Sequence, residues 1–514
     1  MSEYLISFDL GTGGNKVSLY NSDGNCIAEV FVEYPTTYPR VGWYEQKPAD
    51  WWKTVVQGTR ELLVKAKINP NDVVCLSISG HSLGVVPIDK KGTLLRDSVP
   101  IWSDARAKQQ AADFFKRFSE EDWYMKTGNG FPPPLYPVFK LMWYRDNEPE
   151  IFNHIYKVLG TKDYINFCLT GHIYTDHSYA SGSGVYDLSK WSYSAELIEI
   201  SELPRDIFPD IVPSTQVIGN LTKESAFALG LSTTVKVVAG GVDNSCMALG
   251  ARNIKEGRIY NSLGSSSWIA ITTKEPVLHK RYRPFVFAAV IPDLFNSAVP
   301  VFSSGTSFRW VRDQFCKDLI KQAQESHQDV YDLMCAEASR SNPGANGIIF
   351  NPNLAGGSAI DESVNVRGAF LGLDLGHTRA DIIRAAMEGI AMESRVSLDV
   401  LRQLTQVGDE MLVVGGGSRN KLWRQIYADV YQMKIIKTNI DQQCAALGAA
   451  ALAAVGIGIW KDFNKIDELH SIVDITEPDP NNSQIYNDIL PVFLKAGGFL
   501  GELGDIMTKI NLRF

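Results

Sequence analysis

A pattern of two short strands joined by a polar, glycine-containing turn occurs twice in this chain, about half the chain apart. The first copy covers residues 4–20 with its turn at Gly11, and Cys26 to Val32 returns as a third strand. The second copy covers residues 258–273 with its turn at Gly264. The repetition predicts two related domains whose turns face a common cleft, although two unrelated hairpins in a large α/β protein would give the same pattern.

The length of 514 residues is more than one hydrophobic core accommodates, so several domains are expected. Strands alternate with helical patterns, as at Thr378 and Asp381, which form a capping box before an apolar helical face. This alternation predicts an α/β fold. We place an N-terminal domain at residues 1–253, a C-terminal domain at 254–490 and a terminal tail or helix at 491–514.

Charge and composition exclude several classes of protein. The net charge is -8 and the basic residues are scattered, so a nucleic-acid partner is not expected. The first residues lack a secretory signal, and Ala445–Trp460, a predicted buried helix, is shorter than the ~20 apolar residues of a membrane span. The 7 cysteines form no Cys-x-x-Cys motif and the 8 histidines show no metal-ligand spacing. We expect a cytoplasmic protein with reduced thiols, no membrane partner and no structural zinc.

Asp9 stands at the carboxyl end of the first strand, before Gly-Thr-Gly-Gly-Asn-Lys16. The small residues of this segment let backbone N–H groups approach an anion closely. The segment is not a P-loop, because Asn15 precedes Lys16 and a hairpin rather than a helix follows. On these residues alone, a phosphate contact and a simple turn are both open.

Two further glycine-rich strand ends are candidates for chemistry. Asp243 follows two glycines, where a substrate hydroxyl meets a carboxylate without obstruction, so it is a candidate general base. The same aspartate would equally serve as the N-cap of a helix over 245–251. Gly415–Asn420 opens a helix over 422–431, and main-chain donors at that helix start are free to contact a nucleotide or another anion.

Together these segments resemble the FGGY carbohydrate kinases, and among them most closely the xylulokinases. The resemblance runs from about Tyr4 to Gly456. In the first half it is carried by Asp9-Leu-Gly-Thr12, Gly42-Trp-Tyr-Glu-Gln46 with Trp51-Trp52, Ser79-Gly-His-Ser-Leu-Gly84, Trp102-Ser-Asp-Ala-Arg106, and Lys162-Asp163 before Leu169-Thr-Gly171. Further along it is carried by Gly240-Gly-Val-Asp243-Asn244, Ser262-Leu-Gly-Ser265, Gly305, Phe370-Leu-Gly-Leu373, Glu388-Gly389, Gly416-Gly-Ser-Arg-Asn420 and Ala446-Leu-Gly-Ala449.

The resemblance implies two actin-like ATPase (ribonuclease H-like) domains around a catalytic cleft, and an ATP-dependent kinase that converts D-xylulose to D-xylulose 5-phosphate. Asp243 would be the proton acceptor, and Asp9 would hold Mg2+ and the transferring phosphate. The implied nucleotide contacts are Thr12, Gly13, Lys16, Gly264, Ser265, Gly305, Gly416 and Asn420. The expected substrate contacts are His81, Ser82, Leu83, Trp102, Asp104, Arg106 and Asn244. The family also suggests a homodimer.

Two departures from the family pattern leave the sugar open. Gly80-His-Ser-Leu-Gly84 stands where xylulokinases commonly have Gly-Gln-Met-His-Gly, which puts Leu83 at the expected contact position. Asn353–Ser358 replaces the usual Gly-Glu-Arg segment and carries neither charge, while Lys16 could substitute for the basic residue of the first loop. Ribulose, erythritol, gluconate and glycerol therefore stay as alternative substrates.

Other readings of the same residues also remain. Trp102, Asp104 and Arg106 would line a sugar pocket, with an aromatic face beside polar groups, or form a structural tryptophan with a surface ion pair. The whole chain would alternatively be an actin-like ATPase without a sugar substrate, or a sugar sensor without activity. The segments 79–84 and 102–106 argue against the ATPase, and the intact Asp9 and Asp243 argue against the sensor.

Overall fold

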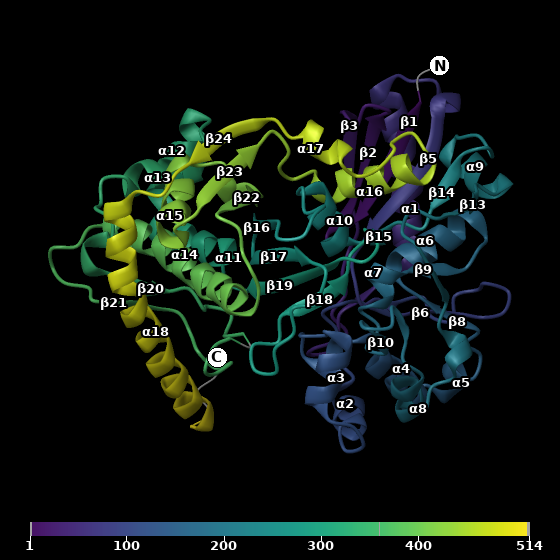
Figure 1. The fold of residues 1–514 in the computed structure, drawn as a ribbon, viewed down its shortest axis with the longest axis horizontal. Helices are drawn as coiled ribbons and strands as arrows, with labels where there is room; N and C mark the ends of the chain where they lie inside the picture. The colour runs from purple at the N-terminus through teal and green to yellow at the C-terminus, as the bar shows by residue number, and fades with distance from the viewer. Residues whose placement is uncertain (1–2, 359, 511–514) are drawn as a thin grey trace.

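The computed structural model describes residues 3–358 and 360–510, and its strands form two seven-stranded sheets that lie on opposite sides of the molecule (Figure 1). The first sheet has the order β13-β14-β5-β1-β2-β3, with β15 beside β5. Its strands are β1 (Tyr4–Leu10), β2 (Gly14–Asn21), β3 (Cys26–Glu33), β5 (Val73–Gly80), β13 (Val217–Asn220), β14 (Lys236–Val238) and β15 (Gly241–Val242).

The second sheet has the order β18-β19-β17-β16-β22-β23-β24. Its strands are β16 (Ile259–Leu263), β17 (Ser267–Thr273), β18 (Phe285–Ala288), β19 (Phe295–Val301), β22 (Glu410–Val414), β23 (Lys434–Thr438) and β24 (Ile472–Thr476). In both sheets three antiparallel strands, β3-β2-β1 and β19-β17-β16, are followed by two parallel ones, β5-β14 and β22-β23. The prediction of two related α/β halves is confirmed.

The helices that matter for the site cover these sheets. They are α1 (Pro48–Ala66), α3 (Glu120–Thr127), α4 (Pro137–Asn147), α6 (Thr161–Thr170), α7 (His177–Ala180), α10 (Asp243–Gly250), α11 (Gly305–Phe315), α14 (Arg379–Leu404), α15 (Lys421–Tyr431), α16 (Cys444–Gly456), α17 (Lys465–Leu469) and α18 (Pro480–Lys509). Helix α14 begins at the predicted capping box, where the backbone N–H of Thr378 donates to the carboxylate of Asp381 at 2.8 Å.

Helices α10 and α16 cross between the two sheets with their backbones in close approach (Figure 1). Glycine is required at the crossing, because a Cβ on Gly250 would lie 1.9 Å from the carbonyl oxygen of Cys444, and one on Gly448 would lie 2.0 Å from that of Cys246. The alanine-rich α16 is the buried helix expected from the sequence. The pair packs against strands of both sheets, so the first residue of α10 lies where the two halves meet.

Two elements lie across the predicted domain boundaries. Helix α16 follows most of the second sheet in the chain but packs against β1 and β5 of the first sheet. Helix α18 continues without interruption through residue 490, so the expected terminal segment is part of a longer helix. The domain limits therefore describe the order of the chain better than the packing.

Within the described residues, no helix has the length and apolarity needed to cross a membrane. All seven cysteines are free, and Cys26 is exposed while five others are buried. The described part of the chain contains no group of three or more histidine, cysteine, aspartate or glutamate side chains arranged to hold a metal ion.

Candidate active site

The turn between β1 and β2 is held in place by three side chains from outside it. The Tyr34 hydroxyl donates to the carbonyl oxygen of Gly11. Gln46 Nε2 donates to the carbonyl oxygen of Thr12 at 2.8 Å, and Trp102 Nε1 donates to Thr12 Oγ1 at 2.9 Å. These three hydrogen bonds fix the shape of the turn, while Thr12 itself stays exposed.

Asp9 ends the first strand, and its carboxylate accepts a hydrogen bond from the Ser79 hydroxyl at 3.0 Å. Burial raises the pKa of Asp9 above its ordinary value, and the positive charge of Lys16 and the Ser79 hydrogen bond oppose that rise. The Lys16 ammonium donates to the carbonyl oxygen of Gln442 at 2.8 Å. Lys16 thus links the first turn to the second half of the chain.

Asp243 is the first residue of α10, and the sharp approach to it depends on glycine. Gly240 has a φ of 72°, and a Cβ there would lie 2.2 Å from the carbonyl oxygen of Ile78. The N-cap position belongs to Val242, so the capping role considered for Asp243 is not the one that the fold gives it. Burial, together with the nearby negative charge of Asp9, raises the pKa of Asp243 to about 7. The fold therefore brings the two predicted carboxylates together.

A chain of buried polar groups fixes the backbone that leads into Asp243. Asp176 accepts hydrogen bonds from the hydroxyls of Ser178 and Ser214, and Ser178 Oγ in turn accepts one from the backbone N–H of Val242 at 3.0 Å. Lys162 and Asn166 both donate to the carbonyl oxygen of Ala239, at 3.2 and 2.8 Å. Since Lys162 also pairs with Asp176 at 2.9 Å, these groups form one connected network.

The turn after β16 opens onto a cavity of about 410 Å³ in the second half. Five of the predicted nucleotide contacts line this cavity: Gly264, Ser265, Gly305, Gly416 and Asn420. The backbone N–H of Gly305 donates to the carbonyl oxygen of Gly264 at 3.2 Å. A Cβ on residue 305 would lie 2.3 Å from that oxygen, so glycine is needed there. Asn420 is the N-cap of α15, with its side-chain oxygen accepting from the N–H of Leu422 at 2.9 Å. The volume suits a nucleoside.

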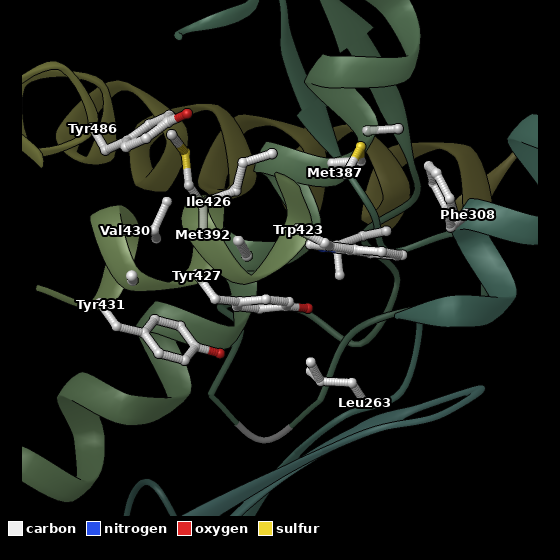
Figure 2. Packing of buried hydrophobic residues seen from close by; sticks show 14 of the residues in the cluster. Leu263, Phe308, Met387, Met392, Trp423, Ile426, Tyr427, Val430, Tyr431 and Tyr486 are labelled. Carbon is white, nitrogen blue, oxygen red and sulfur yellow. The ribbon is translucent and has the colours of Figure 1, made fainter. Parts of the chain in front are cut away.

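Aromatic side chains form one wall of the cavity. Trp423 and Tyr427, one helical turn apart on α15, have nearly parallel rings with centroids 6.2 Å apart, and Phe308 lies 4.6 Å from Trp423. Figure 2 shows Trp423 between Phe308 and Tyr427, with Leu263 across from them. Trp423 Nε1 and the Tyr427 hydroxyl are buried, so this wall presents aromatic surface rather than these polar atoms to the cavity.

The Gly80–Gly84 segment lies at the end of β5, with His81 and Leu83 in the protein core. The His81 ring meets Trp51 edge to face at 5.5 Å, and burial lowers its pKa to about 4, so the imidazole is neutral. Leu83 has a positive φ of 58°. Its carbonyl oxygen accepts from the buried Lys140 ammonium at 3.1 Å, and the same ammonium donates to Ile101 at 2.6 Å. Lys140 therefore joins this segment to the one that contains Trp102.

Asp104 and Arg106 form an ion pair whose side chains have no exposed surface, so the pair is buried rather than superficial. Arg106 pairs with Asp104 at 2.8 Å and Glu45 at 2.6 Å, and its guanidinium stacks on Trp43 at 4.0 Å. The same Asp104 oxygen, Oδ2, also accepts from the backbone N–H of Tyr44 at 2.7 Å. These contacts use the charged groups within the chain and fix the segment that carries Trp102.

A cluster of aromatic rings from both halves lies beside this segment. Trp102 and Phe131 belong to the first half, and Phe285 and Trp268 to the second. The ring centroids of Phe131 and Phe285 are 3.8 Å apart, and Trp102 and Trp268 lie 6.4 and 6.3 Å from these two rings respectively. The cluster also packs against Val242, next to the predicted base. An apolar wall thus adjoins Asp243.

Comparison with known proteins agrees with this geometry. The N-terminal domain of the FGGY family of carbohydrate kinases matches residues 4–250, and the family's C-terminal domain matches residues 259–457. The chain belongs to the FGGY family of carbohydrate kinases. As an FGGY kinase, it is a sugar phosphotransferase with the two-domain fold expected from its sequence.

Relatives of this FGGY kinase extend over nearly its whole length. It is 30% identical to a xylulose kinase from Staphylococcus xylosus, over 95% of this chain and 99% of the relative. It is 26% identical to a gluconokinase from Bacillus subtilis strain 168, over 97% of this chain and 96% of the relative. The structure of a xylulose kinase from Rhodospirillum rubrum has a TM-score of 0.88 at 26% identity, covering 98% of this chain and 100% of that one.

Sequence reasoning missed several residues that line the cavity of this FGGY kinase: Phe308, Arg309, Asp329, Tyr331, Asp332, Trp423 and Tyr427. Trp423 and Tyr427 were within reach, because two aromatic residues one turn apart directly after a glycine-rich helix start indicate a ring-lined pocket. Tyr331 and Asp332 come from a distant helix and carry no such signal. Conversely, Thr12, Gly13 and Lys16 do not line this cavity; Thr12 and Gly13 lie on the turn between β1 and β2, and Lys16 lies on β2.

Proposed function

We propose that this enzyme transfers the γ-phosphoryl group of ATP to a hydroxyl of D-xylulose, giving D-xylulose 5-phosphate. The observation that carries the proposal is the placement of Asp243: partly exposed, beside Asp9, at the start of the helix where the two halves meet, with a pKa near 7. A base with that pKa can take a proton near neutral pH, which typically contributes ~10²- to 10⁴-fold to a rate.

The residues present fit a magnesium-bound nucleotide. Asp9 is a partly exposed carboxylate whose ionised form is disfavoured by burial, so a bound cation would stabilise it, and carboxylate oxygens are ligands that Mg2+ prefers. We assign the adenosine to the cavity, with Gly305, Gly416 and Asn420 beside it. Gly264 and Ser265 on one turn, Thr12 and Gly13 on the other, and Lys16 on β2 would hold the phosphates. Bound MgATP supplies the phosphoryl group and neutralises charge as it transfers.

The chain's own residues then perform two tasks. Asp243 orients the attacking sugar hydroxyl and accepts its proton at a carboxylate oxygen. The network through Ser178 and Lys162 keeps that carboxylate in place. It does so because it binds the carbonyl oxygen of Ala239 and the backbone N–H of Val242, which lie just before Asp243 in the chain. The aromatic cluster beside Asp243 limits the access of water, which would otherwise compete with the sugar for the phosphoryl group.

A neutral sugar suits the site better than a sugar acid. The three cations near the sugar segments are already engaged: Arg106 with two carboxylates, Lys162 with two carboxylates, and Lys140 with two carbonyl oxygens. A substrate carboxylate would have to displace one of these partners. Asn244, Ser82 and Trp102 are left to contact hydroxyls and the apolar face of a sugar, with His81, Leu83, Asp104 and Arg106 supporting them from behind.

The test is ADP release by the purified enzyme with MgATP and a panel of ketoses, polyols and sugar acids, with a no-sugar blank. We expect D-xylulose to give the highest kcat/KM, and the reaction product to carry phosphate on its 5-hydroxyl by NMR. If gluconate were the best acceptor, the preference for a neutral sugar would be wrong, because one of the engaged cations would then have to bind the substrate carboxylate. ADP release without stimulation by any sugar would favour an ATPase. We also place the enzyme in the cytoplasm, in keeping with its free thiols.

A further inference from the structure

The half-buried Trp102 is hydrogen-bonded to a residue that the proposed function assigns to the other substrate. Trp102 belongs to the segment expected to contact the sugar, and its Nε1 donates to the Thr12 hydroxyl at 2.9 Å, across 90 positions of the chain. Thr12 lies on the turn between β1 and β2, which is expected to hold the phosphates of ATP. This hydrogen bond therefore joins the sugar region directly to the phosphate turn.

The ring of Trp102 also adjoins the aromatic cluster beside Asp243. It lies 6.4 Å from the ring of Phe131, which packs in the cluster that includes Val242, the residue before Asp243. A sugar that presents a hydroxyl to Asp243 would lie beside the Trp102 ring, where an aromatic face suits the apolar side of a sugar. Trp102 thus combines a ring available to the sugar with a nitrogen bound to the phosphate turn.

The backbone of Thr12 is held separately, through the protein core. Gln46 Nε2 donates to the Thr12 carbonyl oxygen at 2.8 Å, and Gln46 Oε1 accepts from Trp51 Nε1 at 2.9 Å. Gln46 and Trp51 are buried, so their contact with the turn is out of reach of a bound substrate. Trp102 is half-buried, so its hydrogen bond to the Thr12 hydroxyl is the contact of the two that a substrate can strengthen.

We propose that Trp102 is a positioning residue that couples the two substrates: a sugar bound against its ring immobilises the indole, fixes the Thr12 hydroxyl and raises the affinity of the turn for ATP. The inference rests on the proposed function, since it requires the sugar beside Trp102 and a phosphate at Thr12. Its physical basis is conformational entropy, because a turn that is already held by an immobilised indole loses less freedom when it closes on a phosphate.

Thermodynamic linkage makes this coupling reciprocal, so ATP must raise the affinity for sugar by the same factor as sugar raises the affinity for ATP. One neutral hydrogen bond contributes about a factor of five to an equilibrium, which sets the expected size of the effect. Without sugar the turn holds ATP less firmly, and this also limits transfer of the phosphoryl group to water.

The test is isothermal titration calorimetry of the full-length enzyme with Mg2+ and AMP-PNP, a non-hydrolysable ATP analogue, with and without saturating sugar. The sugar is D-xylulose, or the compound of the panel above that stimulates ADP release most. For the wild type we expect the dissociation constant of AMP-PNP to fall about fivefold when sugar is present. Trp102→Phe keeps an aromatic ring but removes the N–H donor. It should abolish this effect, while the affinity for sugar without nucleotide changes about twofold or less.

Substitutions of the acceptor test the same hydrogen bond from its other end. Thr12→Val removes the hydroxyl and should also abolish the effect, whereas Thr12→Ser keeps a hydroxyl and should retain it. The double variant of Trp102→Phe and Thr12→Val should lose no more than either single variant, because both remove one hydrogen bond. The matched control is Trp191→Phe, at a half-buried tryptophan of the same half whose ring packs against His177 and Phe295, and it should keep the full effect.

The coupling and the proposed function fail in different ways. A sugar that is phosphorylated but leaves the AMP-PNP affinity of the wild type unchanged would overturn the coupling and leave the proposed function standing. A Trp102→Phe enzyme that keeps the full effect would do the same. A panel in which no compound stimulates ADP release would overturn the proposed function and the coupling with it. Far-ultraviolet circular dichroism shows whether each variant is folded.

Discussion

The regions proposed to bind the nucleotide and the sugar are built in different ways. On the side proposed to bind the nucleotide, the predicted residues Gly264, Gly305 and Gly416 line an open cavity and have no side chain beyond the backbone. On the side proposed to bind the sugar, His81 and Arg106 are buried, and Arg106 is paired with carboxylates of the chain itself. The predicted nucleotide residues therefore lie at the surface of the cavity, whereas several predicted sugar residues are buried and would support the residues that contact the sugar. Substitutions on the two sides should accordingly change different kinetic parameters.

The largest expected effect is on kcat, and it comes from Asp243, which is proposed to act on both substrates. Asp243→Asn keeps the size of the side chain but removes the proton acceptor, so kcat should fall ~10²- to 10⁴-fold. The affinity for nucleotide, measured by equilibrium binding, should change little, because the residue belongs to neither nucleotide turn. Unchanged turnover in this variant would remove Asp243 as the base and leave the two sides without a common centre.

A second substitution is designed to damage the sugar side alone. Lys140→Met leaves the carbonyl oxygens of Leu83 and Ile101 without their buried donor, at a cost of about 2 kcal/mol in unfolding free energy. Because this ammonium holds two sugar segments together, the KM for sugar should rise about thirtyfold while the KM for ATP changes little. Equal increases in both KM values would mean that Lys140 supports the whole domain rather than the sugar surface.

The converse substitution is designed to damage the nucleotide side. Trp423→Ala removes the central ring of the aromatic wall and should raise the KM for ATP about tenfold, with the KM for sugar unchanged. Trp310→Ala is the matched control, because Trp310 is a partly exposed tryptophan of the same half that does not line the cavity. A nucleotide KM that does not respond to Trp423→Ala would place the adenosine elsewhere.

The same contrast explains what the sequence could reveal. Glycine at 240, 305 and 415 is needed where a strand turns sharply or two backbones approach, so these turns were predictable from local spacing. The helix over Arg379–Leu404 was also predictable, because the capping box that starts it needs only two residues three positions apart.

The sugar side lacked such a signal. Lys140, Glu45 and Ser178 are important through partners 39 to 64 residues away, and nothing near them in the chain indicates those partners. Asp104 and Arg106 were recognisable as a pair, but their burial depends on Trp43 and Trp143, which only the folded chain brings together. Tertiary contacts of this kind are outside the reach of motif spacing.

The smallest effect expected is on stability, and it follows from the pKa of about 7 at Asp243. The pKa of an aspartate in an unfolded chain is about 3.9, so between these values the unfolded state releases a proton that the folded state keeps. The wild type should therefore lose stability as pH rises from 4 to 7, and Asp243→Asn should not. At pH 8 without ligands, the inactive variant should melt a few degrees above the wild type by calorimetry, with the difference vanishing near pH 4. If the wild type and Asp243→Asn had equal melting temperatures at both pH values, the Asp243 carboxylate would be ionised in the folded state at little cost. The surroundings of Asp243 would then resemble the open nucleotide side rather than the buried sugar side.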